Sequence, residues 1–190
     1  MANEQKELTK FQKFFAHLKT IRQHRRLVIK WAFKMGIPLL GLLHDLSKYR
    51  PSELIIYKWY SPTRSPHEVC REELGYSPTH SLHKWRNKHH SERWQDHPDS
   101  HTVIPIKIPY KYVIEMFCDM VSTGKVYYKE NWTPAATLEY YTYNKLERCA
   151  MHPDSEKLLL HLMIKLYTLN SEKAFIKWYR KNKKELKKNY

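Results

Sequence analysis

Glycine and cysteine are scarce in this chain, and both shortages limit what it can be. Only 4 glycines and 3 cysteines occur among 190 residues, while 42% of the residues are hydrophobic. Because β-sandwiches need many tight turns, so little glycine favours a helical globular protein. The three cysteines, Cys70, Cys118 and Cys149, are odd in number and widely spaced. They exclude a disulfide framework or a cysteine-based zinc knuckle, and we expect a reducing, cytoplasmic compartment.

Long apolar segments and acidic residues are also in short supply. The N-terminus lacks the apolar stretch of a signal peptide, and the apolar run at residues 37–43 is far too short to cross a bilayer, so we expect no membrane partner. The 19 acidic residues are outnumbered by 34 Lys and Arg, which gives a net charge of +15. Such an excess favours an anionic partner, either a small phosphate compound or a nucleic acid, although a lysine-rich surface also serves solubility.

Apolar residues recur at helical spacing along most of the chain, and no clear strand is visible. Stop and start signals, such as Gly36 before Pro38 and Ser77 before Pro78, separate the segments. Helices are expected over residues 10–35, 38–46, 52–60, 78–94, 109–124, 133–150, 155–169 and 171–190, with a helical turn at 68–74. Residues 95–108 are expected to be irregular, or extended at 103–108. We predict one all-α domain over residues 1–190 with a lysine-rich C-terminal helix at about 171–190. The segment at 38–46 is apolar nearly all round and is expected in the middle of the core.

The adjacent pair His44 and Asp45 is the strongest sign of chemistry. An imidazole and a carboxylate after an apolar run suit a buried metal site, and mixed nitrogen and oxygen ligands fit Zn, Fe, Mn, Co or Ni better than Ca or Mg. His24 lies on the apolar face of its predicted helix, and Asp119 borders the apolar face of another. Taken singly, His24 suits a core histidine and Asp119 a partner of some Lys or Arg. Together they predict a four-ligand site.

A histidine, a His-Asp pair and a later aspartate, all on helices, resemble the HD superfamily of metal-dependent phosphohydrolases. Three blocks carry the resemblance: residues 44–54 (HDLSKYRPSEL), residues 87–90 (NKHH) with Trp94, and residues 112–120 (YVIEMFCDM). They look like an uncharacterised HD-like family of bacteria and viruses, over roughly residues 24–124. The resemblance implies an all-α, HD-domain-like bundle around a buried metal site, and the interior of the host cell if the protein is viral.

Carried over residue by residue, the resemblance makes His24, His44, Asp45 and Asp119 the metal ligands. Some HD enzymes hold a second ion with two further histidines. On a continuous helix over residues 78–94, His83 and His90 share a face and are the expected pair. His89 lies about 100° round that helix and is expected to point elsewhere. A hydrated, histidine-rich helix is the structural alternative.

These residues predict a hydrolase that acts on a nucleotide or related phosphate ester, with one or two divalent transition-metal ions. Asp45 would orient the attacking water, and Lys48 would contact a phosphate oxygen unless it is an ordinary surface lysine. His83 or His90 would protonate the leaving oxygen if it is free of metal. Arg86 and Asn87 are expected to help bind the substrate.

Two other functions stay open on the sequence alone. The first is a basic nucleic-acid-binding protein with a structural or degenerate HD-like site, since residues 177–188 are rich in lysine and aromatic residues are frequent. The second is a di-iron HD-like oxygenase, because Glu115 beside Asp119 adds a carboxylate ligand. Lys48 makes this function slightly less favoured than phosphate chemistry.

Overall fold

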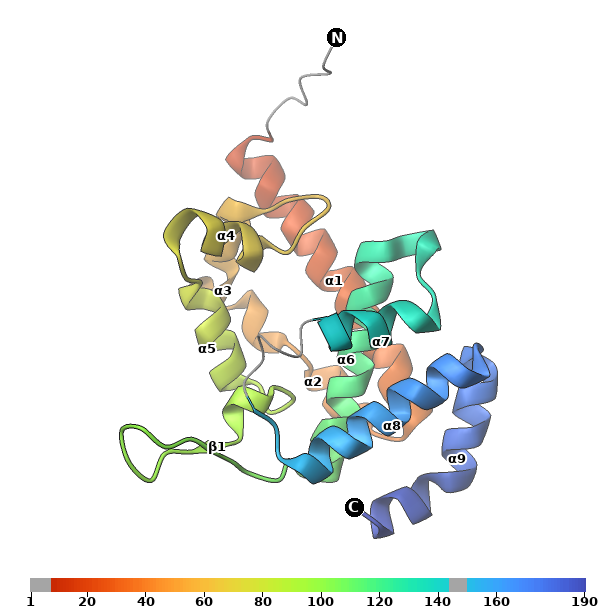
Figure 1. The fold of residues 1–190 in the computed structure, drawn as a ribbon. Helices are drawn as coiled ribbons and strands as arrows, with labels where there is room; N and C mark the ends of the chain where they lie inside the picture. The colour runs from red at the N-terminus through yellow and green to blue at the C-terminus, as the bar shows by residue number, and fades with distance from the viewer. Residues whose placement is uncertain (1–7, 144–149) are drawn as a thin grey trace.

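The structure is a computed structural model that describes residues 8–143 and 150–190, and it is an all-α fold, as expected (Figure 1). The α-helices are α1 (Lys10–Met35), α2 (Pro38–Leu43), α3 (Pro51–Leu54), α4 (Pro66–Leu74), α5 (Pro78–Arg86), α6 (Tyr110–Tyr128), α7 (Pro134–Tyr143), α8 (Pro153–Leu169) and α9 (Glu172–Lys188). Short 3₁₀ turns are η1 (Leu46–Tyr49), η2 (Ile55–Trp59), η3 (Ser91–Arg93) and η4 (Lys129–Asn131). The strands β1 (Gln95–Asp96) and β2 (Ile104–Pro105) pair antiparallel, with Gln95 opposite Pro105.

Helix α1 begins and ends where the sequence predicts. Thr9 and Gln12 form a reciprocal capping box, which satisfies backbone N–H groups at the first turn. Gly36 adopts φ 78° at the other end, a left-handed conformation that glycine reaches without a steric penalty. The face between these caps buries His17, His24, Val28 and Trp31, so polar and apolar groups share one side of the helix.

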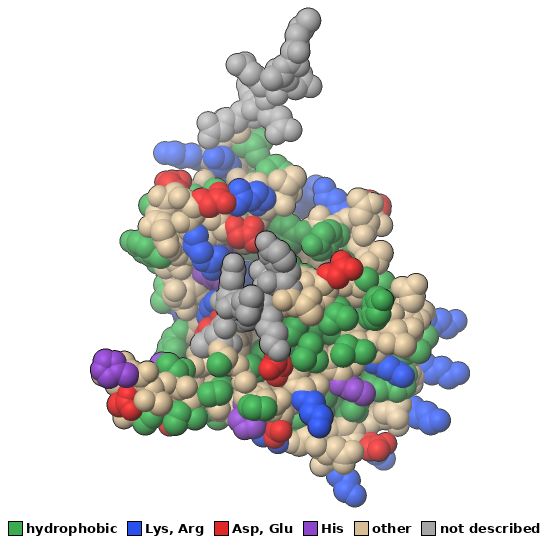
Figure 2. All heavy atoms as spheres, in the orientation of Figure 1, with side chains coloured by type: hydrophobic (Ala, Val, Ile, Leu, Met, Phe, Trp, Pro, Cys, Tyr) green, Lys and Arg blue, Asp and Glu red, His purple; other side chains and the backbone are tan. Residues whose placement is uncertain are grey.

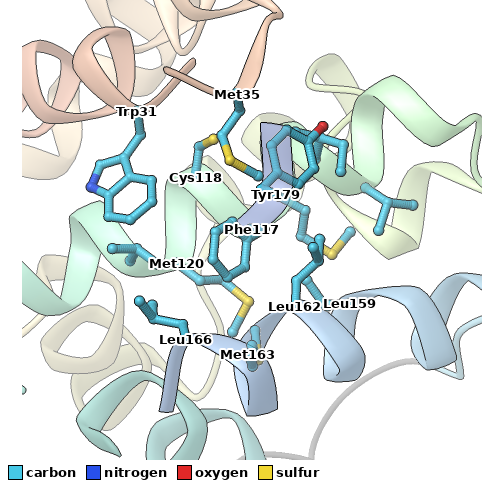
Figure 3. Close-up of a cluster of buried hydrophobic side chains, with 14 of the residues drawn as sticks. Trp31, Met35, Phe117, Cys118, Met120, Leu159, Leu162, Met163, Leu166 and Tyr179 are labelled. Atoms are coloured by element: carbon cyan, nitrogen blue, oxygen red, sulfur yellow. The ribbon is translucent and has the colours of Figure 1, made fainter. Parts of the chain in front are cut away.

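Helix α6 is the central helix of the fold. Ten of its residues are buried, including Phe117, Cys118 and Val121, so almost its whole circumference is covered. It packs against α1, α8 and α7. Figure 3 shows side chains of α1, α6, α8 and α9 meeting in one hydrophobic cluster, with Trp31, Phe117 and Tyr179 among them. The core therefore spans segments far apart in the chain.

The prediction that residues 38–46 lie in the middle of the core was wrong. Helix α2 ends at Leu43, and Gly41 is its only buried residue. Leu39 and Leu42 are 66% and 48% exposed. The reason is close packing: a Cβ on Gly41 would lie 2.4 Å from Cβ of Ala32. The helix therefore meets α1 along its glycine face and turns its leucines outward.

Three other boundaries differ from expectation. Helix α5 ends at Arg86, because Asn87 has extended dihedrals, so the predicted helix over residues 78–94 was wrong. Gly124 lies within α6, which continues to Tyr128. The predicted turn at residues 68–74 is a full helix, α4. The second half of the helix predicted at residues 133–150, with Cys149, lies largely outside the described residues.

The lysine-rich helix α9 is part of the fold as well as of the surface. Its buried residues Phe175, Ile176 and Tyr179 join the core. Lys and Arg side chains project along the right-hand and lower edges of the view in Figure 2, where Figure 1 places α9. Within residues 8–143 and 150–190, no helix has both the length and the apolar character needed to span a bilayer.

The substitution Gly41→Ala tests the close packing of α2 on α1. Alanine is a better helix former than glycine, so helix propensity alone predicts a higher free energy of unfolding. We expect a loss of about 1–3 kcal/mol in the free energy of unfolding, because the added methyl group overlaps Ala32. Urea unfolding measures it. The control Leu42→Ala, on the exposed side of α2, should change stability by less than about 0.5 kcal/mol. Equal or higher stability of the Gly41 variant would contradict this packing.

Candidate metal centre

Four side chains from three parts of the fold converge on one point. His24 extends from α1, His44 and Asp45 lie just after α2, and Asp119 extends from α6. The Nε2 atom of His24 lies 3.3 Å from Nε2 of His44 and 3.0 Å from Oδ1 of Asp119. The Oδ2 atom of Asp45 lies 3.6 Å from Nε2 of His24 and 3.3 Å from Nε2 of His44. The structure thus brings together the four residues that the sequence singled out.

An unusual backbone conformation lets neighbouring residues face the same point. Asp45 has φ 53° and ψ 25°, in the left-handed region that aspartate tolerates better than most residues. His44 is extended in ψ, so the helix ends there. The side chain of Arg25 donates hydrogen bonds to the carbonyls of Leu42 and His44, both at 2.8 Å. Arg25 therefore holds the end of α2 in place.

A second group of histidines lies on the other side of Asp45. Nε2 of His83 is 3.3 Å, and Nε2 of His89 is 3.5 Å, from Oδ1 of Asp45. His90 lies beside both rings, with centroids 4.9 Å from His83 and 4.4 Å from His89. Ligand atoms of these three histidines come close enough to share an ion.

The expectation that His89 points elsewhere was wrong. It rested on a helix that continues past Asn87, whereas the chain turns there and brings His89 inward, with only 2% of the residue exposed. His83 and His90 do face one region, as expected, and His89 joins them, with its Nε2 3.5 Å from Oδ1 of Asp45.

Buried glutamates orient the imidazole rings. Oε1 of Glu115 lies 3.0 Å from Nδ1 of His44 and 3.3 Å from Nδ1 of His89. Oε2 of Glu53 lies 2.9 Å from Nδ1 of His83. A carboxylate accepts a hydrogen bond from Nδ1–H, which leaves the Nε2 lone pair free to bind a metal. The Nε2 atoms of His44, His83 and His89 all face Asp45. The tautomer with the proton on Nδ1 therefore leaves each Nε2 free to bind a metal ion beside this carboxylate.

Sequence reasoning missed the role of Glu53 and gave Glu115 only a minor one. Glu115 lies one turn before Asp119 on α6, so the spacing contained a signal for it. Glu53 sits in a short helix whose position depends on the whole fold, and no local pattern marks it.

The pKa values of the cluster respond to burial and to opposite charges. Burial favours the neutral forms of Asp45 and Asp119, but neighbouring histidines, and Lys48 for Asp45, outweigh it and hold both pKa values well below the usual range. Burial also opposes protonation of His44, yet the surrounding carboxylates raise its pKa well above the ordinary value. The cluster is therefore anionic enough to attract either a proton or a cation.

The charges in and around the cluster leave room for a divalent ion. The carboxylates of Asp45, Glu53, Glu115 and Asp119 face the two cations Lys48 and Arg86. Arg86 lies 2.8 Å from Glu53, and Lys48 Nζ lies 2.6 Å from Oδ2 of Asp45. Leaving the histidines out of the count, the four carboxylates exceed the two cations by two negative charges, and the raised pKa of His44 reflects the same need for a positive counter-charge.

The geometry of the cluster also fits a divalent ion. Among the described residues, neither carboxylate oxygen of Asp45 has a hydrogen bond of good geometry, and Nε2 of His89 and His90 also lack one. Ligands about 2.0–2.2 Å from one ion lie roughly 2.8–3.6 Å from each other. The separations of 3.0–3.6 Å around His24 and His44 match this range. The residues present therefore fit a transition-metal ion.

The residues predicted to bind substrate divide into two kinds. Lys48 lies at the cluster, and Asp45 and Asp119 outweigh burial to raise its pKa. Arg86 and Asn87 instead hold neighbouring residues in place. Arg86 is paired with Glu53. Asn87 Nδ2 donates to Oγ of Ser47 and to the carbonyl of His83. Burial and the adjacent His89 and His83 hold the pKa of His90 well below its usual value, which favours a ligand over a proton donor.

Three further histidines, His17, His67 and His80, lie near Lys48. His67 lies 3.0 Å from Oγ of Ser77 and stacks on His80. Burial, and then the charge of Lys48, lowers the pKa of His17 to about 4. Burial also lowers the pKa values of His67 and His80. His17 and His67 line a small cavity together with Lys48, Glu53 and His83, so their rings lie beside the cluster.

The chain belongs to DUF5662, a family of unknown function, whose model matches residues 13–165. No curated protein and no solved structure matches it. The matched region contains all of the clustered residues described above. Because the family carries no assigned activity, the HD-type assignment stays a prediction.

The low pKa of His17 predicts acid destabilisation. The unfolded chain binds a proton on His17 near pH 6.5, whereas the folded chain does so only near pH 4. Stability should therefore fall as pH drops between these values, by up to about 3 kcal/mol for this residue. Denaturant unfolding at pH 7 and pH 4 should show a smaller loss for His17→Gln than for the unaltered chain. His161→Gln, at an exposed site, is the control, and parallel losses in both variants would contradict the prediction.

Proposed function

We propose that the protein is a metal-dependent phosphohydrolase that acts on a nucleotide or related phosphate ester. One observation carries the proposal: Asp45 lies between two groups of imidazoles whose Nε2 atoms face it. One oxygen belongs to the group with His24 and His44, and the other to the group with His83 and His89. This is the arrangement expected when a carboxylate bridges two ions.

In this proposal, the residues of the cluster have different roles. A divalent ion, when bound, would lower the pKa of a water ligand and offset the charge of phosphate oxygens. His24, His44 and Asp119 would hold one ion and His83, His89 and His90 a second, with Asp45 available to both. Glu115 and Glu53 keep the imidazoles in the ligating tautomer. Lys48 holds a phosphate oxygen beside Asp45 through its ammonium group.

Metal content is the first test. Purified protein should contain Mn, Fe, Zn, Co or Ni by elemental analysis, and Asp45→Ala should lose it, because both ligand groups depend on this carboxylate. Glu115→Gln should weaken metal binding about 10–100-fold, since it replaces the carboxylate that faces two ligand histidines with an uncharged amide, a weaker acceptor. Asp99→Asn, in an exposed loop, is the control. Full metal occupancy in the Asp45 variant would contradict the site.

Hydrolysis is the second test. A screen of phosphate esters with added Mn²⁺ or Fe²⁺ should show turnover that Asp45→Ala abolishes and Asp99→Asn retains. A metal-loaded protein without phosphatase activity would contradict the proposed reaction. Bound iron together with oxygen consumption would favour the oxygenase instead.

A second candidate function, nucleic-acid binding, is favoured by a basic stripe on the opposite side of α1 from His24. Lys19, Arg22, Arg26 and Lys30 are exposed and line a shallow surface groove. We expect the triple variant with Ala at positions 22, 26 and 30 to weaken RNA or DNA binding and reduce its salt dependence. Removal of α9 is a poorer test, because it would also remove the buried Tyr179. No binding by the unaltered chain at low salt would exclude this function.

A further inference from the structure

An exposed apolar surface lies where α2 packs on α1. The two helices meet at Gly41, where a Cβ would lie 2.4 Å from Cβ of Ala32. Gly41 is the only buried residue of α2, and three leucines share the outer side of this short helix: Leu39, Leu42 and Leu43. Each of them is 48–66% exposed. Leucines grouped in this way on a surface mark a contact site more often than leucines scattered singly.

A stripe of basic residues runs along the neighbouring side of α1. Four exposed side chains share this side, at intervals of four, four and three residues: Arg22, Arg26, Lys30 and Phe33. Ala32, where α2 packs, immediately precedes Phe33, and successive residues of a helix are about 100° apart. The stripe therefore adjoins the side of α1 on which the leucines of α2 lie. We call the stripe and the three leucines together the α1–α2 face.

The segment that forms this face carries charge of one sign. Residues 8–44 contain eight lysines and arginines and no aspartate or glutamate. The face therefore has no acidic residue of its own segment to offset Arg22, Arg26 and Lys30. A partner that covers it must offer negative charge to these cations and an apolar medium to the leucines.

The surface of an anionic bilayer fits both parts of the face. Anionic headgroups attract exposed lysines and arginines, and the boundary with the acyl chains takes up leucine and phenylalanine side chains. A nucleic acid would satisfy the arginines, but a leucine side chain has no aromatic ring to stack on a base. A second copy of the chain would bring like charges together, because a symmetric contact pairs a surface with itself.

We propose that the α1–α2 face binds the surface of an anionic membrane. The leucines of α2 and Phe33 enter the acyl boundary, and Arg22 and Arg26 contact the lipid headgroups. Such a contact needs no spanning helix, so it agrees with described helices that cannot cross a bilayer. The expectation of no membrane partner concerned segments that enter or cross a bilayer as a whole. None of the proposed metal ligands belongs to the face, so the membrane contact can fail or hold independently of the proposed hydrolysis.

Sedimentation of the full chain with unilamellar vesicles tests this proposal. Vesicles of phosphatidylcholine with about 30% phosphatidylserine should bind the chain, and binding should weaken as salt rises. Vesicles of phosphatidylcholine alone should bind it at least about tenfold more weakly, because they offer the arginines no net negative charge.

A double variant tests the apolar part of the contact. Leu39→Ser with Leu42→Ser should weaken binding to the anionic vesicles about 10–100-fold, because two inserted side chains are lost. The matched control is Leu74→Ser with Leu82→Ser, which changes two exposed leucines of α4 and α5 and should leave vesicle binding unchanged. Circular dichroism should show the same helix content in both variants and in the unaltered chain.

A second double variant tests the basic part, and the remaining outcomes identify other partners. Arg22→Ala with Arg26→Ala should weaken binding to the anionic vesicles about tenfold. Unchanged vesicle binding by the leucine variant would overturn the insertion of α2. If the unaltered chain does not sediment with anionic vesicles, the proposal is wrong. Loss of nucleic-acid binding in the arginine variant alone would then assign the stripe to nucleic acid, and a dimer that the leucine variant abolishes in analytical ultracentrifugation would assign the face to a second copy.

Discussion

The buried carboxylate of Asp45 is the group on which the site depends. It is 1% exposed, and a charge so far from water is stable only when other groups compensate it. Compensation comes from both sides, through His24, His44 and Lys48 at one oxygen and His83 and His89 at the other. The imidazoles in turn need Glu115 and Glu53, so a single buried charge organises residues from α1, α3, α5 and α6 together with the turns between them.

Helix α6 links this polar centre to the apolar core. Glu115 and Asp119 face the histidines, while Phe117 and Val121 on the same helix are fully buried in the hydrophobic cluster. Because a well-packed interior resists displacement, the core holds the carboxylates in position. A cavity made at Phe117 should therefore disturb the ligand geometry as well as the stability.

The sequence predicted those parts of the site that depend on local patterns. His24 and Asp119 could be placed because each lies at helical spacing beside apolar residues, and the end of α1 could be placed because Gly36 marks it. His89 was misplaced because α5 ends at Asn87 without a glycine or proline to mark the stop. Helix α2 was misplaced for a different reason: an all-round apolar pattern cannot show that α2 packs closely on α1 at Gly41 while Leu39 and Leu42 are exposed.

Protons are a poorer solution than a metal ion for this cluster. Nε2 of His24 and Nε2 of His44 face each other at 3.3 Å, and two lone pairs at that distance repel unless a cation lies between them. A single proton satisfies one such pair, whereas one ion can bind both nitrogens and two carboxylates together. The family match, residues 13–165, includes every one of these ligands and ends before α9.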